Sequence, residues 1–419
     1  MASYVFSTNP NVVFQTTDLL SVNTTSAASL SVFQQGSEVI LTNGVNTATL
    51  RGILLEQLAT SNVTFTDGSV LLIGDNTTGA AADSAANTLT GTALNDQLIG
   101  LAGNDILDGG AGSDRIYGNQ GEDNITSAAS TAGGNDTVYG GKGNDVINYA
   151  NATASGNQLI YGNLENDAIT GSSGNDTVFG GQGNDTVSGG PGNDRVYGNL
   201  GDDSIVGGAG NNLIYGNQGS DRIVGSAGGN DTVFGGMDGD NINYSSLLAA
   251  DVSLIYGNRG DDILIGGAGK DTLYGGKEND DLTGNLGADS LFGNLGNDTF
   301  TYNNVTTTVA NNDSGVTTAT ADVVNDFVSG QDKVRVFLAG VDTPGTSSNY
   351  REYADATVTT VELAVTSFAG RPGSTPYTFV AGATDGYLVI DVGTNGTVDS
   401  VIVLKGLNAQ SLFDSADIT

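Results

Sequence analysis

The chain has 419 residues, and its 13 Lys and Arg against 47 Asp and Glu leave a formal net charge of −34. It contains no Cys and no His, which excludes zinc, haem and iron–sulfur sites of the usual kind, disulfide bonds and His-dependent catalysis. The strong negative charge also argues against binding to nucleic acid or to an anionic membrane.

Residues 1–88 form the first predicted segment. Short apolar stretches near 39–41, 63–65 and 70–73 predict β-strands. The first ten residues lack the basic stretch and apolar core of a secretory signal peptide, and no apolar run in the chain is long enough to span a bilayer. Glu38 and Glu56 leave a two-carboxylate glycosidase formally open. We expect instead a small β unit that caps the fold or takes part in assembly, and no enzyme.

A nine-residue unit repeats from residue 91 to residue 301, as in GGAGSDRIY (109–117) and GGPGNDRVY (189–197). The pattern G-G-x-G-x-D-x-U-x, where U is a large apolar residue, resembles the RTX nonapeptide family of calcium-binding repeats. Two units make one coil, so residues 18 apart stack. We therefore predict an all-β fold: a right-handed parallel β-roll (β-solenoid) over residues 89–301, flanked by small N- and C-terminal β domains at 1–88 and 302–419.

An aromatic residue ends every second unit. The spacing is 18 residues, with four insertions, of four, four, one and four residues, that all fall in the turn entering the aromatic strand. The side chain at this position should point outward, because the apolar residue before it points inward. The column is either an intramolecular stack or a docking face for another subunit or the terminal domain. Its members are Tyr117, Tyr139, Tyr161, Phe179, Tyr197, Tyr215, Phe234, Tyr256, Tyr274 and Phe292.

The acidic sixth position of the unit forms two columns, one for each turn of the coil. The first column has Asp in all its members: Asp105, Asp123, Asp145, Asp167, Asp185, Asp203, Asp221, Asp240, Asp262, Asp280 and Asp298. The second column has Asp in most members: Asp96, Asp114, Asp136, Asp176, Asp194, Asp231, Asp271 and Asp289. In the second column Gln158, Asn212 and Ser253 stand where Asp is missing.

These columns predict the metal sites. Carboxylates stacked about 5 Å apart repel one another unless a cation lies between them. Ca²⁺ accepts 6–8 oxygen ligands, so we expect about 10–14 Ca²⁺ ions held by the Asp residues and turn carbonyls. The alternative is a series of Gly/Asp turns that need no ion. If ions bind, their row should be continuous along the first column and interrupted near Gln158, Asn212 and Ser253.

The C-terminal region, 302–419, loses the repeat. Its DVVNDFVSGQDKVRV (322–336) resembles the segment that follows the roll in serralysin-type secreted proteins. Residues 404–419 are similar to the uncleaved signal of type I secretion substrates. The resemblance implies export of the unfolded chain by an ABC transporter to the outside of a bacterial cell. The segment DVGTNGTVD (391–399) is either a degenerate calcium loop or a hairpin turn at Asn-Gly, and we favour the hairpin.

Taken together, the chain resembles RTX surface-layer and other extracellular structural proteins. We predict a secreted calcium-binding structural protein that folds on extracellular Ca²⁺ and self-assembles into a layer or filament. The expected partners are other copies of the chain and, during export, the type I transporter, with no nucleic acid and no membrane span. The alternative is a calcium-dependent adhesin or biofilm-matrix protein that binds glycans.

Overall fold

The structure is a computed structural model, and it divides into two compact units, Met1–Ser204 and Ile205–Thr419. In the part of the chain that the structure describes, no helix is long and apolar enough to cross a membrane. The described residues are 3–5, 11–13, 19–22, 31–35, 38–42, 47–51, 63–65, 70–73, 85–127, 134–150, 156–246, 251–305, 314–315, 317, 319–338, 350–354, 358–369, 376–391, 398–409 and 413–418.

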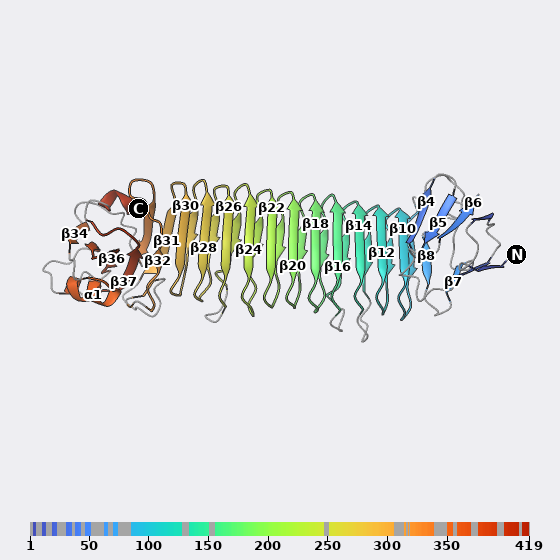
Figure 1. Cartoon of the computed structure of the whole chain (residues 1–419), viewed down its shortest axis with the longest axis horizontal. Coiled ribbons are helices and arrows are strands. Elements are labelled where there is room, and N and C mark those ends of the chain that lie inside the picture. The colour runs from blue at the N-terminus through green and yellow to red at the C-terminus, as the bar shows by residue number, and fades with distance from the viewer. Residues whose placement is uncertain are drawn as a thin grey trace. The chain divides into compact units, whose positions relative to one another are not determined.

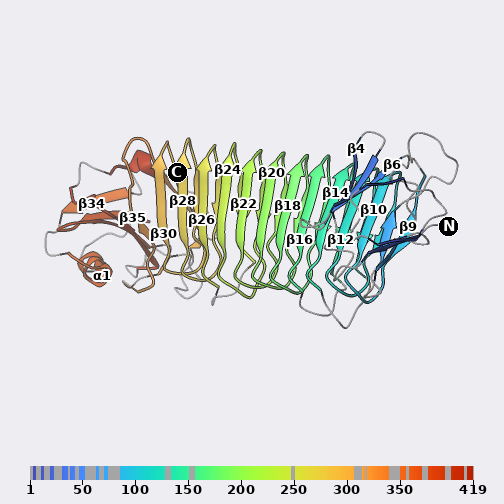
Figure 2. The ribbon, with the colours of Figure 1, turned by 45° about the vertical axis from the view of Figure 1, so that its right-hand side comes forward.

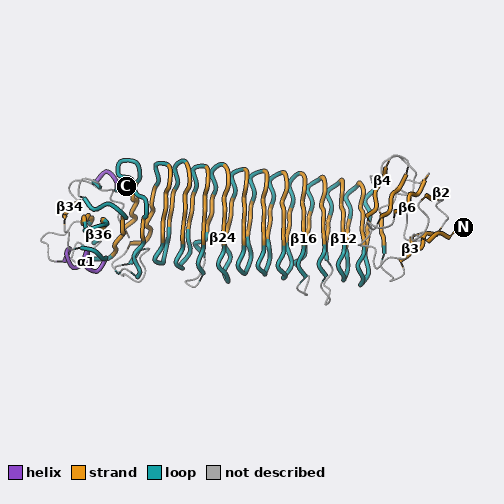
Figure 3. The backbone as a smooth tube through the Cα atoms, in the orientation of Figure 1, coloured by secondary structure: helices purple, strands orange, loops and turns teal. Residues whose placement is uncertain are grey.

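The first unit contains two parallel sheets that the chain visits alternately, so each coil consists of one long and one short strand joined by turns (Figure 1, Figure 3). The long-strand sheet runs in the order β8 (Leu71–Ile73), β10 (Gln97–Ala102), β12 (Arg115–Gln120), β14 (Thr137–Lys142), β16 (Leu159–Leu164), β18 (Thr177–Gln182) and β20 (Arg195–Leu200). The short-strand sheet runs in the order β9 (Thr88–Thr90), β11 (Ile106–Asp108), β13 (Asn124–Thr126), β15 (Val146–Asn148), β17 (Ala168–Thr170) and β19 (Thr186–Ser188).

The N-terminal part of this unit adds two small sheets. One contains β1 (Ser3–Val5), β3 (Leu19–Val22) and β7 (Val63–Phe65), all parallel. The other has the order β2 (Asn11–Val13), β6 (Thr47–Arg51), β5 (Glu38–Thr42) and β4 (Ser31–Gln35), with β4, β5 and β6 antiparallel. The strands expected near 39–41, 63–65 and 70–73 are thereby confirmed.

The second unit repeats the two-sheet coil, and β21 (Ser204–Val206) lies at the division between the units. Its long-strand sheet contains β22 (Leu213–Gln218), β24 (Thr232–Met237), β26 (Leu254–Arg259), β28 (Thr272–Lys277), β30 (Ser290–Leu295) and β32 (Val323–Val324) (Figure 2). Its short-strand sheet contains β23 (Arg222–Val224), β25 (Asn241–Asn243), β27 (Ile263–Ile265), β29 (Asp281–Thr283), β31 (Thr299–Val305) and β33 (Lys333–Leu338). The pairing pattern of the roll thus continues past residue 301.

The C-terminal part of the second unit is a mixed sheet with one helix. β34 (Tyr350–Ala354) is parallel to β35 (Tyr377–Ala381), which continues antiparallel through β36 (Gly386–Ile390) and β37 (Ser400–Leu404). β37 is also parallel to β32, which ties this sheet to the roll. Helix α1 (Val361–Ala369) buries Val361 and Ala364 in one core with β36 and β37, and a short 3₁₀ turn, η5 (Ser415–Asp417), lies near the chain end.

The core of the roll is a single stack of apolar side chains from each sheet. In the long strands of the first unit, Ile116, Val138, Ile160, Val178 and Val196 are fully buried. The short strands contribute Leu107, Ile125, Ile147, Ile169 and Val187. Alternation along each strand turns every second residue inward, so one coil buries very little and the stack of coils makes the core. The predicted all-β parallel β-roll is confirmed.

Candidate calcium-binding turns

The two Asp columns occupy opposite turns of the coil. The first column lies in the turn that leads from a long strand to a short strand, and the second column lies in the turn that leads back. All of the Asp residues predicted as ligands are at most 4% exposed. Asp is rarely buried to this extent unless it is paired or binds a metal. The columns therefore need partners that satisfy their charge.

One oxygen of each carboxylate holds neighbouring coils together. The backbone N–H of Asp123 donates to Oδ1 of Asp145 at 2.8 Å, and that of Asp145 donates to Oδ1 of Asp167 at 2.8 Å. In the second unit Asp240 donates to Asp262 in the same way, also at 2.8 Å. A charge-assisted hydrogen bond to the backbone fixes each carboxylate in the turn. The other oxygen, Oδ2, remains for a different partner.

In most members of the first column, the Oδ2 atom is buried and accepts no hydrogen bond from the protein. A Cβ placed on Gly140 would collide with Oδ2 of Asp145 and would also meet the carbonyl oxygen of Gly162, so these two oxygens line one small space that glycine keeps open. An unpaired buried carboxylate oxygen is costly in a protein interior. The described first-column members with this geometry are Asp123, Asp145, Asp167 and Asp185 in the first unit, and Asp240, Asp262 and Asp280 in the second.

The donor set fits Ca²⁺. Carboxylate and carbonyl oxygens are the hard ligands that Ca²⁺ prefers, and it tolerates irregular geometry better than Mg²⁺ does. Among the described residues, no three acidic side chains come together as a metal cluster. Each ion would be held by carboxylates of two successive coils together with turn carbonyls.

Burial changes the protonation of these groups. The pKa of Asp167 is raised to about 8, mainly by burial and in part by the negative charges of Asp145 and Asp185, although the hydrogen bond from the Asp145 backbone lowers it. Burial likewise raises the pKa of Asp240 and of Asp280 to about 8. An ordinary Asp has a pKa near 4. Without a cation, the carboxyl groups in the folded turns therefore tend to be protonated. A bound divalent cation would allow them to be ionised.

The second column is different, because protein groups bind several of its Oδ2 atoms. Ser172 Oγ donates to Oδ2 of Asp176 at 3.0 Å, and the Gly267 backbone N–H donates to Oδ2 of Asp271 at 2.6 Å. Thr92 Oγ1 donates to Oδ2 of Asp96 at 2.9 Å. These oxygens already have donors, so the second column is less uniform than the first.

Two of the interruptions predicted in the second column contain an amide in place of a carboxylate. Gln158 Nε2 donates to the carbonyl oxygen of Gly134 at 3.0 Å. Asn212 Nδ2 donates to the carbonyl oxygen of Gly208 at 2.9 Å. In both turns an N–H group points at a carbonyl that would otherwise be available to a cation. The expected gaps in the row of ions stay a prediction, which these contacts support.

Two tyrosines belong to this edge although the sequence analysis did not single them out. Tyr149 and Tyr244 are fully buried and stand at the first position of the unit, where Gly is common. The Tyr244 hydroxyl donates to Oδ2 of Asp231 at 3.0 Å, and the Tyr149 hydroxyl lies beside the Asp136 carboxyl. The signal in the sequence that could have identified these two tyrosines is a large aromatic residue in place of that Gly.

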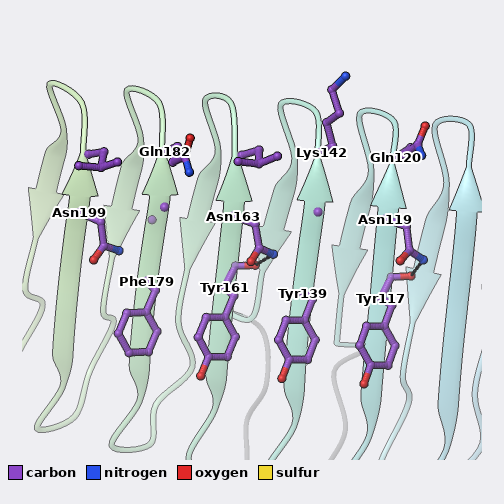
Figure 4. A pocket seen from close by; sticks show the side chains of 15 residues that line it. Tyr117, Asn119, Gln120, Tyr139, Lys142, Tyr161, Asn163, Phe179, Gln182 and Asn199 are labelled. Atoms are coloured by element: carbon purple, nitrogen blue, oxygen red, sulfur yellow. Dashed lines mark hydrogen bonds between the residues drawn. The ribbon is translucent and has the colours of Figure 1, made fainter. Parts of the chain in front are cut away.

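The aromatic column is stacked within each unit. Ring centroids of Tyr117 and Tyr139 are 5.0 Å apart, those of Tyr139 and Tyr161 4.9 Å, and the planes differ by 4° and 3°. Figure 4 shows these rings side by side on successive strands, with Asn119 and Asn163 next to them. These rings and Asn residues line a shallow groove of about 780 Å³ that has no acidic residue among its described lining residues. The intramolecular stack is present, and the docking interpretation stays a prediction.

Among the comparisons with known proteins, the family model agrees with the geometry of the turns. No curated protein matches the chain. A crystal structure described as a hyperactive, Ca²⁺-dependent, β-helical antifreeze protein from an Antarctic bacterium is similar at 18% sequence identity and a TM-score of 0.29, covering 72% of this chain and 94% of that chain. The family model of the RTX calcium-binding nonapeptide repeat matches residues 90–125, 130–151, 154–187, 161–196, 197–229, 253–282 and 274–304. The chain therefore contains RTX calcium-binding nonapeptide repeats that form a β-roll and bind several Ca²⁺ ions.

Proposed function

We propose that this is a secreted structural protein whose roll folds when it meets extracellular Ca²⁺ and which then associates with other copies in an extracellular or cell-surface layer or filament. The observation that carries the calcium step is the set of buried Oδ2 atoms without a hydrogen-bond partner at Asp123, Asp145, Asp167, Asp185, Asp240, Asp262 and Asp280 of the first Asp column. Extracellular calcium sites bind with Kd values of about 10⁻⁴–10⁻³ M, far above cytosolic calcium. The chain would therefore remain unfolded inside the cell and fold outside.

The chain end supports export before folding. Phe413 and Ile418 are at most 2% exposed, the Phe413 ring stacks on Phe379 at 5.0 Å, and Ile418 bridges to Val334. These residues lie in the segment similar to a type I secretion signal. A transporter that recognises this segment has access to it in the unfolded chain, because folding buries it.

The groove over the aromatic column supports self-association. A chain with a net charge of −34 needs a surface of low negative charge in order to approach another copy. The described groove of the first unit offers Tyr and Phe ring edges, amides and Lys142, without an acid. In the second unit, a groove of about 430 Å³ over Tyr215 and Phe234 includes Arg259 and likewise has no acid among its described lining residues.

The alternative is a glycan-binding adhesin, and one feature of the same groove favours it. Asn119, Gln120, Asn163 and Gln182 present amides that could bind sugar hydroxyls. The parallel stacking of the rings weakens this alternative, because each ring face is covered by the next ring and a sugar could contact mainly the edges.

Purified full-length protein distinguishes the two functions. Negative-stain microscopy and light scattering should show lattices or fibres after addition of millimolar Ca²⁺ and monomers in EDTA. Dispersed monomers in Ca²⁺, together with specific binding on a glycan array, would replace self-assembly with adhesion.

A further inference from the structure

The N-terminal and C-terminal parts of the chain contain the same three-stranded unit. Strands β4, β5 and β6 form an antiparallel meander, and so do β35, β36 and β37. In both meanders Asn-Gly stands between the second and third strands, and the third strand leads into a similar sequence, LRGI (50–53) or LKGL (404–407). Each third strand is also parallel to one further strand, with Leu50 opposite Val12 of β2 and Leu404 opposite Val324 of β32. The two meanders can therefore be compared strand by strand.

The surroundings of the first strand differ between the two meanders. In the C-terminal meander β35 has a neighbour on each side, because it pairs with β36 and, in parallel, with β34 over its whole length from Tyr377 to Ala381. In the N-terminal meander the sheet order is β2-β6-β5-β4, so β4 is the last strand. Among the described residues, no strand pairs with the outer edge of β4. A position that a strand fills in one meander is thus open in the other.

The open edge of β4 lacks the features that usually prevent pairing between molecules. Proteins protect edge strands with charged side chains, Pro or bulges. β4 contains only Ser, Val, Phe and Gln, and its register with β5 runs without a bulge from Ser31 to Gln35. Both of these end residues are exposed. The edge therefore offers five consecutive residues of unprotected strand to a partner.

The charge distribution favours a second copy of the chain as that partner. Residues 1–51 contain two acids, Asp18 and Glu38, and one base, Arg51, so they contribute −1 to the total of −34. Elsewhere the negative charge opposes the approach of another copy. An uncharged edge gives no charge complementarity to a different, charged partner, whereas the backbone groups of a strand edge are complementary to the same edge in antiparallel orientation. Two-fold contacts of this kind are the commonest between identical chains.

We propose that two copies pair along β4 in an antiparallel, two-fold symmetric contact that joins their N-terminal four-stranded sheets into one continuous sheet. Backbone hydrogen bonds between the two edges supply the contact, as in β-strand addition. Pairing over the full strand places Phe33 at the two-fold axis and Ser31 opposite Gln35 of the second copy. The inference rests on the proposed self-association and specifies one of its contacts. Because a two-fold contact closes after two copies, a layer or filament needs a second contact, for which the aromatic groove remains available.

Charge substitutions at the two exposed ends of β4 test the contact in the full-length protein. Ser31→Lys with Gln35→Lys places Lys opposite Lys at both ends of the pair, and like charges on paired strands are destabilising. In millimolar Ca²⁺, sedimentation velocity should show that the protein concentration needed for association rises about tenfold, although the chain has become less negative. Ser31→Lys with Gln35→Glu places Lys opposite Glu and should associate like the wild type.

The matched control adds the same charge elsewhere in the first unit. Ile106→Lys with Val146→Lys changes two exposed residues of the short-strand sheet, and the variant should associate like the wild type. Wild-type association of the Lys/Lys variant of β4, or equal weakening in the control, overturns the β4 contact. A Lys/Glu variant as weak as the Lys/Lys variant overturns the antiparallel arrangement, because parallel strands would bring like charges together in both.

Disulfide trapping is the second measurement, and it uses a chain that has no Cys of its own. Ser31→Cys with Gln35→Cys places two thiols about 13 Å apart along one strand, too far for a bond within the chain. Oxidation in Ca²⁺ should give covalent dimers, which Ile106→Cys with Val146→Cys should not give. Absence of dimers overturns the contact. If the wild type assembles while the β4 variants behave like it, only this contact fails; a wild type that stays monomeric in Ca²⁺ contradicts the proposed self-association itself.

Discussion

The Tyr244 hydroxyl donates a 3.0 Å hydrogen bond to Oδ2 of Asp231, thirteen residues before it in the same coil. In the first column the equivalent oxygen of Asp240 has no hydrogen-bond partner. Two buried carboxylates in adjacent turns thus have different partners, a phenol in one and a proposed Ca²⁺ in the other. The contact divides the predicted ligands into those that need an ion and those that the protein satisfies by itself.

Tyr244→Phe should destabilise the roll, because it leaves Oδ2 of Asp231 buried without its donor. The expected loss is about 1–3 kcal/mol of unfolding free energy, measured as a lower urea midpoint in millimolar Ca²⁺. Tyr274→Phe, which changes a hydroxyl in the outward aromatic column, is the control and should have little effect. Equal midpoints for both variants would contradict the role given to Tyr244.

Removal of Ca²⁺ should unfold the repeats. Residues 91–301 contain 28 acids and 7 bases, and the thin core cannot offset the repulsion among buried carboxylates. Far-UV CD in EDTA should lose most of its β signal and regain it on addition of millimolar Ca²⁺. Full β content in EDTA would exclude calcium-dependent folding.

The pH dependence follows from the raised pKa values of the first column. The pKa of Asp167, Asp240 and Asp280 is about 8 in the folded chain without metal, and an ordinary Asp has a value near 4. Between pH 4 and pH 8 the folded state therefore binds more protons than the unfolded state, and the unfolding free energy of the metal-free chain decreases as the pH rises. In EDTA, CD should show more β structure at pH 5 than at pH 8.

Protons and Ca²⁺ compete for the same oxygens, so the calcium dependence should have the opposite trend. The Ca²⁺ midpoint of folding should increase as the pH is lowered from 8 to 6. A midpoint that does not change over this range would mean that the buried carboxylates are not the ligands.

Asp167→Asn and Asp176→Asn compare the two columns directly. Asp167 belongs to the first column and its Oδ2 has no protein donor, whereas Oδ2 of Asp176 accepts from Ser172. We expect Asp167→Asn to raise the Ca²⁺ midpoint by about two- to tenfold, because affinity depends on the number of charged ligands. Asp176→Asn should raise it less. Equal shifts in the two titrations would remove the distinction between the columns.

The aromatic groove can be tested without touching the Asp columns. Tyr139→Ser combined with Tyr161→Ser removes two stacked rings from the floor of the groove in the first unit. Each lost ring pair should cost about 0.5–1.5 kcal/mol of stability, while Ca²⁺ binding remains. If the groove binds a neighbouring copy, the variant folds but does not form lattices or fibres under the microscope. Normal assembly would mean that the contact between copies lies elsewhere, and the terminal β sheets would be tested next.

The sequence by itself determined the roll, because each coil contacts mainly its neighbours and a spacing of 18 residues brings equivalent positions together. The inward residues Ile116 and Val138 and the stacking of both Asp columns follow from that period alone. Tertiary structure decided how the two columns differ. Which Oδ2 atom has a donor depends on side chains from other positions, such as Ser172 and Tyr244, and their direction is set by packing in the turns.

The tertiary structure also determines where the two Asp columns end. Asp289 and Asp298 donate their backbone N–H groups to Oδ1 of Asp322 at 2.9 Å and of Asp332 at 3.0 Å, so both columns continue into the segment that the sequence placed in the C-terminal domain. The separations of 33 and 34 residues break the period, so spacing could not reveal the continuation. There, β32 pairs with β30 and β33 pairs with β31, so they cover strand edges that would otherwise be exposed. This strand pairing sets the register.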